Sequence, residues 1–208
     1  MKKRRNNKIT KNPLNCLLEF LQYYFYKTLI HFFLKRKNII VNMKKDLDLK
    51  WTDLVSPTMS PDEYLREFGE KIKYNYKVYE PKADILKEIN AILKSKNERL
   101  KIVALGADWC PDCHKNVPRM IKLIKRMKTN DVEFRILYGI MVNALHKPGE
   151  TLWHKTRSPP EAVNPKFELE AIPTFYFFNK NNEYLGQIKE HPKETIEEDT
   201  LEILKDSL

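Results

Sequence analysis

The 208-residue sequence contains few cysteines and few glycines, three and five respectively. So few cysteines exclude a small fold held together by several disulfides. No internal repeat or low-complexity linker divides the chain, so its length predicts one globular domain with an additional segment. The globular part holds only two cysteines, which suits a reducing compartment, and we therefore expect a cytoplasmic protein.

Positive charge is concentrated in residues 1–42, which hold ten Lys or Arg and one Glu and lack Ala, Gly and Asp. The formal net charge of the whole chain is +10, so this leader carries nearly all of it. The rest of the chain is almost neutral and has no basic motif interleaved with aromatic residues. We therefore expect no nucleic-acid partner.

An apolar stretch within this leader, residues 14–34, has two interpretations. As a membrane anchor it includes Glu19 and Lys27, and each charge near mid-bilayer costs about 2.5 to 3.5 kcal/mol, against about 0.3 to 0.6 gained per Leu, Ile or Phe. No small-residue cleavage site follows it. The alternative is that translation starts at Met43 and that the leader is absent or disordered in the working protein. Membrane contact is expected only if the leader is real.

Residues 43–80 predict an N-terminal cap on the main domain. Ser60 to Glu63 read as a helix start, with serine as cap, proline first and glutamate third. The following Tyr64, Leu65 and Phe68 are expected to face the core. Three further tyrosines alternate like a strand, or lie in a packed loop, at positions Tyr74, Tyr76 and Tyr79.

Alternating helices and strands are predicted over residues 81–208. Helical spacing of apolar residues occurs in residues 81–95, in the segment from the paired cysteines to Met127, and in residues 193–205. Short apolar runs typical of strands occupy residues 100–105, 132–138, 175–178 and 183–188. The polar residues 179–182 suit a hairpin turn between the last two strands.

Cys110 and Cys113 lie where a strand-like run gives way to helical periodicity. The N-terminus of a helix favours thiolate over thiol, because its backbone N–H groups are unpaired and the helix dipole is positive there. Cys110 is therefore the predicted nucleophile. Cys113 lies one helical turn further on, so it can attack a mixed disulfide on Cys110 and release the substrate as a thiol.

The same Cys-x-x-Cys spacing also occurs in zinc and haem sites. A closed zinc site needs four nitrogen or sulfur ligands, and beyond His114 the only further thiol is that of Cys16, far upstream. Cys110 to His114 also match the c-type haem pattern, but here they follow a strand and open a helix. We expect no metal and no bound cofactor, with His114 as a surface residue.

Two separated segments, 107–113 and 166–175, together with Pro118, resemble the thioredoxin family over about residues 80–208. The resemblance implies an α/β thioredoxin fold, a central mixed sheet flanked by helices, here with an N-terminal helical extension. It also implies a cis Ile172–Pro173 bond that faces the dithiol, with Trp109, Ile172 and Pro173 as substrate-binding residues; an ordinary trans bond at the start of an edge strand is the alternative. A cis bond would expose the Ile172 backbone to an extended substrate.

The chain departs from the family pattern at two places. Thioredoxins carry a buried aspartate six residues before the first cysteine, and here that position is Ala104. Asp108 is a candidate substitute in proton handling, or else a solvated cap. The dipeptide between the thiols is Pro111-Asp112, and a carboxylate beside the thiols disfavours thiolate. Asp108, Pro111 and Asp112 are the predicted tuning residues, and the Asp112 carboxylate predicts a reductant rather than a strong oxidant.

The connection from Tyr138 to Ile172 is longer than is usual in the family and contains an insertion at about residues 141–165. Long connections are often functional. The insertion carries aromatic and basic side chains, namely His146, Trp153, His154 and Arg157. It is either a lid that selects an acidic partner or a packing insertion.

The sequence as a whole predicts an enzyme, a dithiol-disulfide oxidoreductase that reduces protein or small-molecule disulfides. Its electrons would come from a reductase or a low-molecular-weight thiol, a partner implied by the family resemblance. One alternative is a thioredoxin-fold binding module whose thiols sense redox state without turnover. Another is a membrane-tethered redox protein for exported partners, which requires residues 14–34 to be an anchor.

Overall fold

The structure is a computed structural model that describes residues 47–208. The predictions for the leader, including the anchor and the start at Met43, fall outside these residues. The helices of the described part are α2 (Pro61–Val78), α3 (Ala83–Ser95), α4 (Pro111–Met127) and α5 (Ile196–Ser207), with short 3-10 turns η1 (Trp51–Asp53) and η2 (Pro160–Ala162). The strands are β1 (Leu100–Leu105), β2 (Val132–Leu137), β3 (Thr174–Phe178) and β4 (Tyr184–Lys189). Within residues 47–208, no helix is both long and apolar enough to cross a bilayer.

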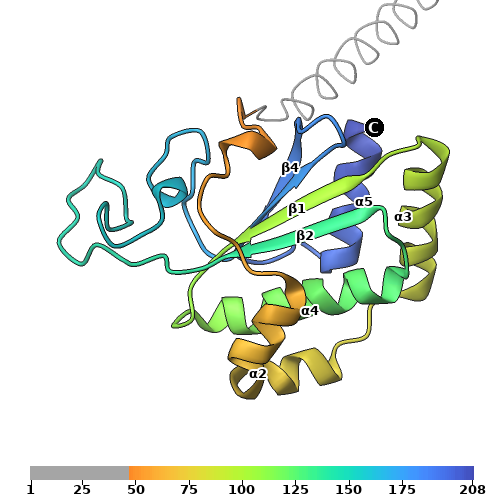
Figure 1. The fold of residues 1–208 in the computed structure, drawn as a ribbon, viewed down its shortest axis with the longest axis horizontal. Helices are drawn as coiled ribbons and strands as arrows, with labels where there is room; N and C mark the ends of the chain where they lie inside the picture. Colours follow the sequence, from red (N-terminus) through yellow and green to blue (C-terminus); the bar gives the residue numbers. More distant parts are fainter. Residues whose placement is uncertain (1–46) are drawn as a thin grey trace, which may run out of the picture. The chain divides into compact units, whose positions relative to one another are not determined.

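The four strands form one mixed sheet in the order β2-β1-β3-β4 (Figure 1). Strand β1 pairs with β2 in parallel and with β3 in antiparallel orientation, and β3 continues to β4 through the predicted hairpin. The central strands β1 and β3 are buried almost throughout, as their continuous apolar runs require. The predicted order of helices and strands is confirmed, with element ends shifted by a few residues.

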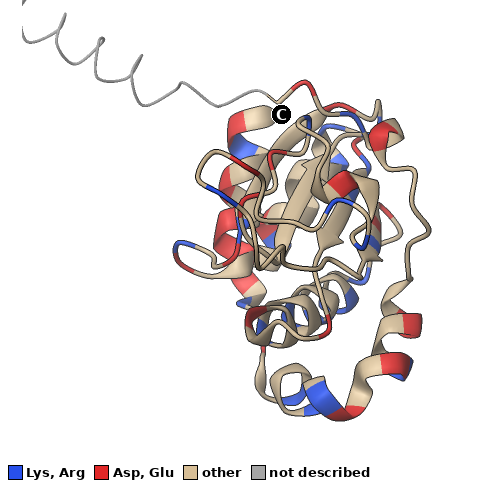
Figure 2. Cartoon of the chain, turned by 90° about the vertical axis from the view of Figure 1, so that its left-hand side faces the viewer, with Lys and Arg blue, Asp and Glu red and all other residues tan. Residues whose placement is uncertain are grey.

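The two faces of the sheet are covered differently. On one face, helix α5 packs so closely that a Cβ on Gly186 of β4 would lie 3.0 Å from Ile203. On the other face, the indole of Trp51 packs edge-on against the ring of Phe178, with the guanidinium of Arg135 5.3 Å from the indole centre. Charged residues of both signs are dispersed over the helices and loops around the sheet (Figure 2).

Helix α2 begins at the predicted helix start and continues into the segment of tyrosines. The Ser60 hydroxyl accepts from the Glu63 N–H, and the Glu63 carboxylate accepts from the Ser60 N–H, so both ends of the capping box form. The strand or loop predicted for the tyrosines is wrong, because the helix runs through Tyr74 and Tyr76 to Val78. Packing of α2 along α4 (Figure 1) overrides the two-residue alternation of the tyrosines.

The insertion extends from the end of the sheet where β1 and β2 finish (Figure 1). Trp153 is buried, and its indole N–H donates to the Leu169 carbonyl at 2.6 Å. The buried Glu161 carboxylate accepts from the N–H groups of Val55 and Ser56, each at 2.8 Å, and from the Ser56 hydroxyl at 2.6 Å. These contacts favour the packing interpretation for this part of the insertion, while His146 and Arg157 are exposed.

Candidate active site

The two paired cysteines lie at the start of α4, just after the loop that connects β1 to this helix. Cys110 is the N-cap residue, and its sulfur accepts a hydrogen bond from the Cys113 N–H at 3.2 Å. Both side chains are free thiols, with exposed fractions of 4% for Cys110 and 0% for Cys113. The Cys110 sulfur therefore occupies the N-terminal position that stabilises a thiolate.

The surroundings lower the pKa of Cys110 to about 7. The main cause is a hydrogen bond from the Cys113 thiol, which outweighs the desolvation of a buried thiolate. Backbone N–H groups of Cys113 and Asp112 lower the pKa further, whereas the negative charge of Asp112 raises it. Cys110 is therefore about half ionised at neutral pH, which suits a nucleophilic thiol.

Cys113 is affected in the opposite direction. Burial raises its pKa far above the ordinary value, and donation to Cys110 raises it further. The Cys113 thiol therefore holds its proton while Cys110 is ionised. One activated sulfur and one protected sulfur lie side by side.

Ile172 and Pro173 lie against the dithiol, as the resemblance implies. The bond between them is cis, and the Cys110 thiol donates to the Ile172 carbonyl at 3.4 Å. The Pro173 carbonyl accepts from the Glu190 N–H at 2.7 Å, which ties this turn to the end of β4. The two segments that carry the resemblance, 62 residues apart, thus meet at the Cys110 sulfur.

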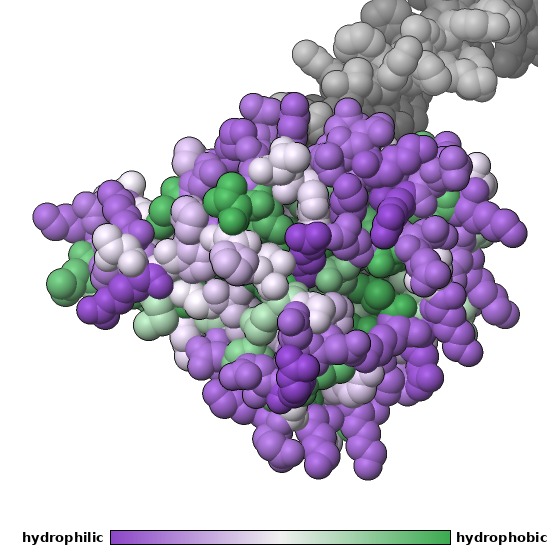
Figure 3. All heavy atoms as spheres, viewed as in Figure 1, coloured by the Kyte–Doolittle hydropathy of each residue, from purple (hydrophilic) through white to green (hydrophobic). Residues whose placement is uncertain are grey.

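Trp109 stands beside the dithiol and is 45% exposed. Its indole N–H donates to the Ile140 carbonyl at 2.9 Å, which ties the dithiol loop to the start of the insertion. Exposed apolar side chains continue from there at Met141, Val142 and Leu145. Figure 3 shows hydrophobic and hydrophilic residues mixed at the end of the molecule formed by the insertion.

The predicted tuning residues differ in how far they are exposed to solvent. Asp108 is exposed and lies 3.8 Å from the Lys71 ammonium, and its backbone carbonyl contacts Nε2 of His114 at 2.6 Å. This position fits the solvated-cap interpretation better than a buried proton carrier. Pro111 is the first residue of α4, and the Asp112 carboxylate is half-buried, 3.7 Å from Nδ1 of His191.

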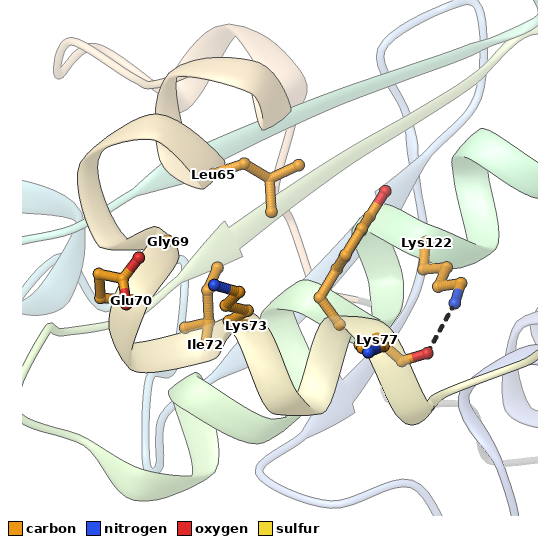
Figure 4. Close-up of a pocket in the computed structure, with 8 residues that line it drawn as sticks. Leu65, Gly69, Glu70, Ile72, Lys73, Lys77 and Lys122 are labelled. Atoms are coloured by element: carbon orange, nitrogen blue, oxygen red, sulfur yellow. Dashed lines mark hydrogen bonds between the residues drawn. The ribbon is translucent and has the colours of Figure 1, made fainter.

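Besides the dithiol, a cluster of possible ligand residues and a cavity in the described chain could hold a ligand. Asp112, Glu190 and His191 offer ligand atoms within 4.8 Å of one another at partly or fully exposed positions. A cavity of about 510 Å³ lies along α2 and includes Ile72 and Lys122 in its lining (Figure 4). None of the predicted site residues lines this cavity, so it is separate from the dithiol.

Residues that sequence reasoning missed contact the inner side of Cys113. The Tyr64 and Tyr138 hydroxyls hydrogen-bond each other at 2.8 Å, and Tyr138 interacts with the Cys113 sulfur. Gly106 lies against both the Tyr138 ring and that sulfur. The sequence features that could have indicated this contact were Gly106 and Tyr138, which follow the neighbouring strands β1 and β2.

Comparison with known proteins supports the resemblance. Residues 58–139 match the family model for thioredoxin. This segment of the chain is thioredoxin-like. The mixed four-stranded sheet flanked by helices fits an α/β thioredoxin fold, and such a domain indicates a redox-related role. The matched segment contains both cysteines, while Ile172 and Pro173 lie beyond it.

No curated protein matches this chain. Similar solved structures include an HIV epitope scaffold, with 15% identity, a TM-score of 0.49, and coverage of 76% of this chain and 89% of the scaffold. A protein of unknown function from Pseudomonas aeruginosa has 16% identity, a TM-score of 0.39 and coverage of 76% and 86%. The thioredoxin of Fasciola hepatica has 19% identity, a TM-score of 0.33 and coverage of 58% and 91%.

Proposed function

We propose that this thioredoxin-like protein is a dithiol-disulfide oxidoreductase that reduces protein or small-molecule disulfides. The observation that carries the proposal is the asymmetry of the two thiols. Cys110 has a pKa of about 7 at a helix N-terminus, whereas burial keeps Cys113 protonated. Such a pair suits attack by the first sulfur followed by resolution by the second.

The proposed reaction has two exchange steps. The Cys110 thiolate attacks one sulfur of the substrate disulfide, which breaks the substrate S–S bond, forms a mixed disulfide and releases one thiolate. Cys113 then loses its proton to that thiolate or to water and attacks the Cys110 sulfur. The Cys110–Cys113 bond forms, and the second substrate thiolate leaves and takes a proton from water. The substrate gains two electrons and the protein loses two.

Trp109, Ile172 and Pro173 are the proposed substrate-binding residues. The Ile172 carbonyl contacts the Cys110 sulfur, Pro173 follows it through the cis bond, and Trp109 exposes apolar surface next to Cys110. Reduction of the resulting disulfide requires a reductase or a low-molecular-weight thiol as electron donor. The proposed compartment is the cytoplasm, which keeps such thiols reduced. Recovery of the native protein in a washed membrane fraction would instead favour the tethered alternative.

Reduction of insulin disulfides with dithiothreitol as electron donor tests the proposal. We expect turnover by the full-length wild-type chain, loss of turnover in Cys110→Ser, and a trapped mixed disulfide in Cys113→Ser. Cys16→Ser is the matched control and should retain full activity. Turnover by Cys110→Ser would refute the assignment of the nucleophile, and an inactive wild type would favour a redox-sensing module.

A further inference from the structure

The inner side of the dithiol is closed by a tyrosine that approaches unusually near to the backbone. Tyr138 follows β2, and its ring lies over Gly106 at the end of β1. A Cβ at Gly106 would lie 2.7 Å from Cε1 of Tyr138 and 3.0 Å from the Cys113 sulfur. Real Cβ atoms essentially never approach another atom as closely as the first of these contacts, and the second is also tight, so the glycine provides the space in which the ring and the sulfur meet.

A second tyrosine holds the first in place. Tyr64 of α2 is fully buried, and its hydroxyl lies 2.8 Å from the Tyr138 hydroxyl. The two rings pack edge to face, 5.2 Å apart, and Phe68 of α2 contacts both of them. This packing fixes the direction of the Tyr138 hydroxyl.

The chemistry of this pair is that of a hydrogen-bond donor. Burial raises the pKa of both tyrosines above the ordinary value, so both hydroxyls stay protonated at neutral pH. The Cys113 sulfur faces the Cys110 thiol, the Ala107 N–H and the Tyr138 hydroxyl. Because a hydroxyl both donates and accepts, Tyr64 can donate to Tyr138 while Tyr138 donates to the sulfur.

We propose that Tyr138, oriented by Tyr64, donates a hydrogen bond to the Cys113 sulfur as it becomes a thiolate and thereby speeds the resolution step. The inference rests on the proposed oxidoreductase function. When Cys113 loses its proton to water or to the first departing thiolate, the Tyr138 O–H stabilises the new negative charge. Cys113 then attacks the Cys110 sulfur, and the hydroxyl keeps its own proton throughout. Tyr138 is the residue in contact with the reacting atom, and Tyr64 is a positioning residue.

The expected effect follows from the strength of such a bond. A hydrogen bond to a charged acceptor stabilises the charged form and lowers the pKa of the acceptor by about one to two pH units. A thiolate with a lower pKa is also a weaker nucleophile, which cancels about half of the gain. Loss of the Tyr138 hydroxyl should therefore slow resolution by about four- to twentyfold.

Dithiobis(nitrobenzoate) separates the two steps, because attack and resolution each release one coloured thiolate. The full-length chain carrying Cys16→Ser, mixed rapidly with one equivalent of the reagent, should give two release phases. Tyr138→Phe should leave the first phase unchanged and slow the second. Tyr64→Phe should slow the second phase by a smaller factor, and the double variant should match Tyr138→Phe.

Tyr176→Phe is the matched control. Its hydroxyl is buried and donates to the Phe167 carbonyl at 2.8 Å, so the substitution removes a comparable hydrogen bond away from the sulfurs. Both release phases of this variant should have the same rates as those of the protein that carries only Cys16→Ser. A slowed second phase in this control would show that any buried tyrosine has the effect, which would overturn the inference.

The remaining outcomes separate the inference from the proposed function. An unchanged second phase in Tyr138→Phe overturns the inference alone, provided that the first phase is intact. Absence of any release from the wild-type dithiol overturns the proposed function and the inference with it. Each tyrosine variant is judged on its own, so a folding defect in one leaves the other as a test. Additive slowing in the double variant would refute the positioning role of Tyr64.

Discussion

Replacing Asp112 with asparagine tests how the first turn of α4 sets the reactivity of Cys110. The backbone N–H of Asp112 lowers the pKa of Cys110, whereas its carboxylate charge raises it. Asparagine keeps the N–H and removes the charge. We therefore expect the pKa of Cys110 to fall below its value of about 7.

The magnitude is modest because the Asp112 side chain is 34% exposed. At this exposure a charge interaction contributes about 0.2 to 1 kcal/mol. At pH 6, where about one-tenth of a thiol with a pKa of about 7 is ionised, alkylation of Cys110 should become about 1.4- to fourfold faster. Above pH 8 the wild-type thiol is already mostly ionised, so the advantage should vanish. The same change should make the disulfide more oxidising by about 4 to 20 mV.

Iodoacetamide alkylation between pH 5 and about 9, followed by mass spectrometry of the Cys110 peptide, measures the change. Cys16→Ser is used as the background, so that its thiol does not compete. Asp131→Asn is the matched control, because this exposed carboxylate precedes β2 at the opposite end of the sheet. An unchanged or raised Cys110 pKa, or a more reducing disulfide, would refute the assigned effect of Asp112.

Two further substitutions test the packing around the site. Gly106→Ala should lower the free energy of unfolding in urea by about 1 to 3 kcal/mol, because its Cβ would overlap the Tyr138 ring. Gly69→Ala should instead raise it by about 0.5 to 1 kcal/mol, because α2 leaves open space at that position. Equal changes in the two variants would refute the clash at Gly106. Glu161→Ala should cost about 2 to 3 kcal/mol, because it leaves the two N–H donors and the Ser56 hydroxyl without their carboxylate, and Glu67→Ala should be neutral. Burial raises the pKa of Glu161, but the hydrogen bonds from Ser56, Val55 and the backbone together outweigh it and lower the pKa below its ordinary value. The stabilising contribution of Glu161 should therefore be present above pH 4.5 and lost as the pH falls below that value, and an unchanged acid-unfolding curve in Glu161→Ala would contradict this.

The sequence was sufficient for the core of the fold because the decisive signals are local. The continuous apolar run of β1 and the helical spacing after Cys113 lie within single elements, and both were predicted with small errors at their ends. The strand or loop predicted for Tyr74 and Tyr76 is wrong because a local pattern was misleading there. Their alternation imitates a strand, and only packing on α4, distant in sequence, decides for the helix.

The inner side of the dithiol was not predictable from local patterns. Tyr64 and Tyr138 are 74 residues apart, and neither lies in a motif with a known spacing. Their meeting depends on where α2 packs, and no periodicity encodes that position. Trp153 is similar, since its buried indole pairs with a carbonyl 16 residues away within an irregular segment.

The short segment before α2 also protects the sheet. Met59 exchanges two backbone hydrogen bonds with Ile136, at 2.8 and 2.9 Å, along the outer side of β2. An uncovered edge strand offers its N–H and C=O groups to other chains and promotes aggregation. The segment that leads into Tyr64 thus also occupies an edge on which a neighbouring molecule would otherwise add a strand. A shortened chain that starts after Met59 would lose this protection, and its tendency to self-associate should rise even where its dithiol is unchanged.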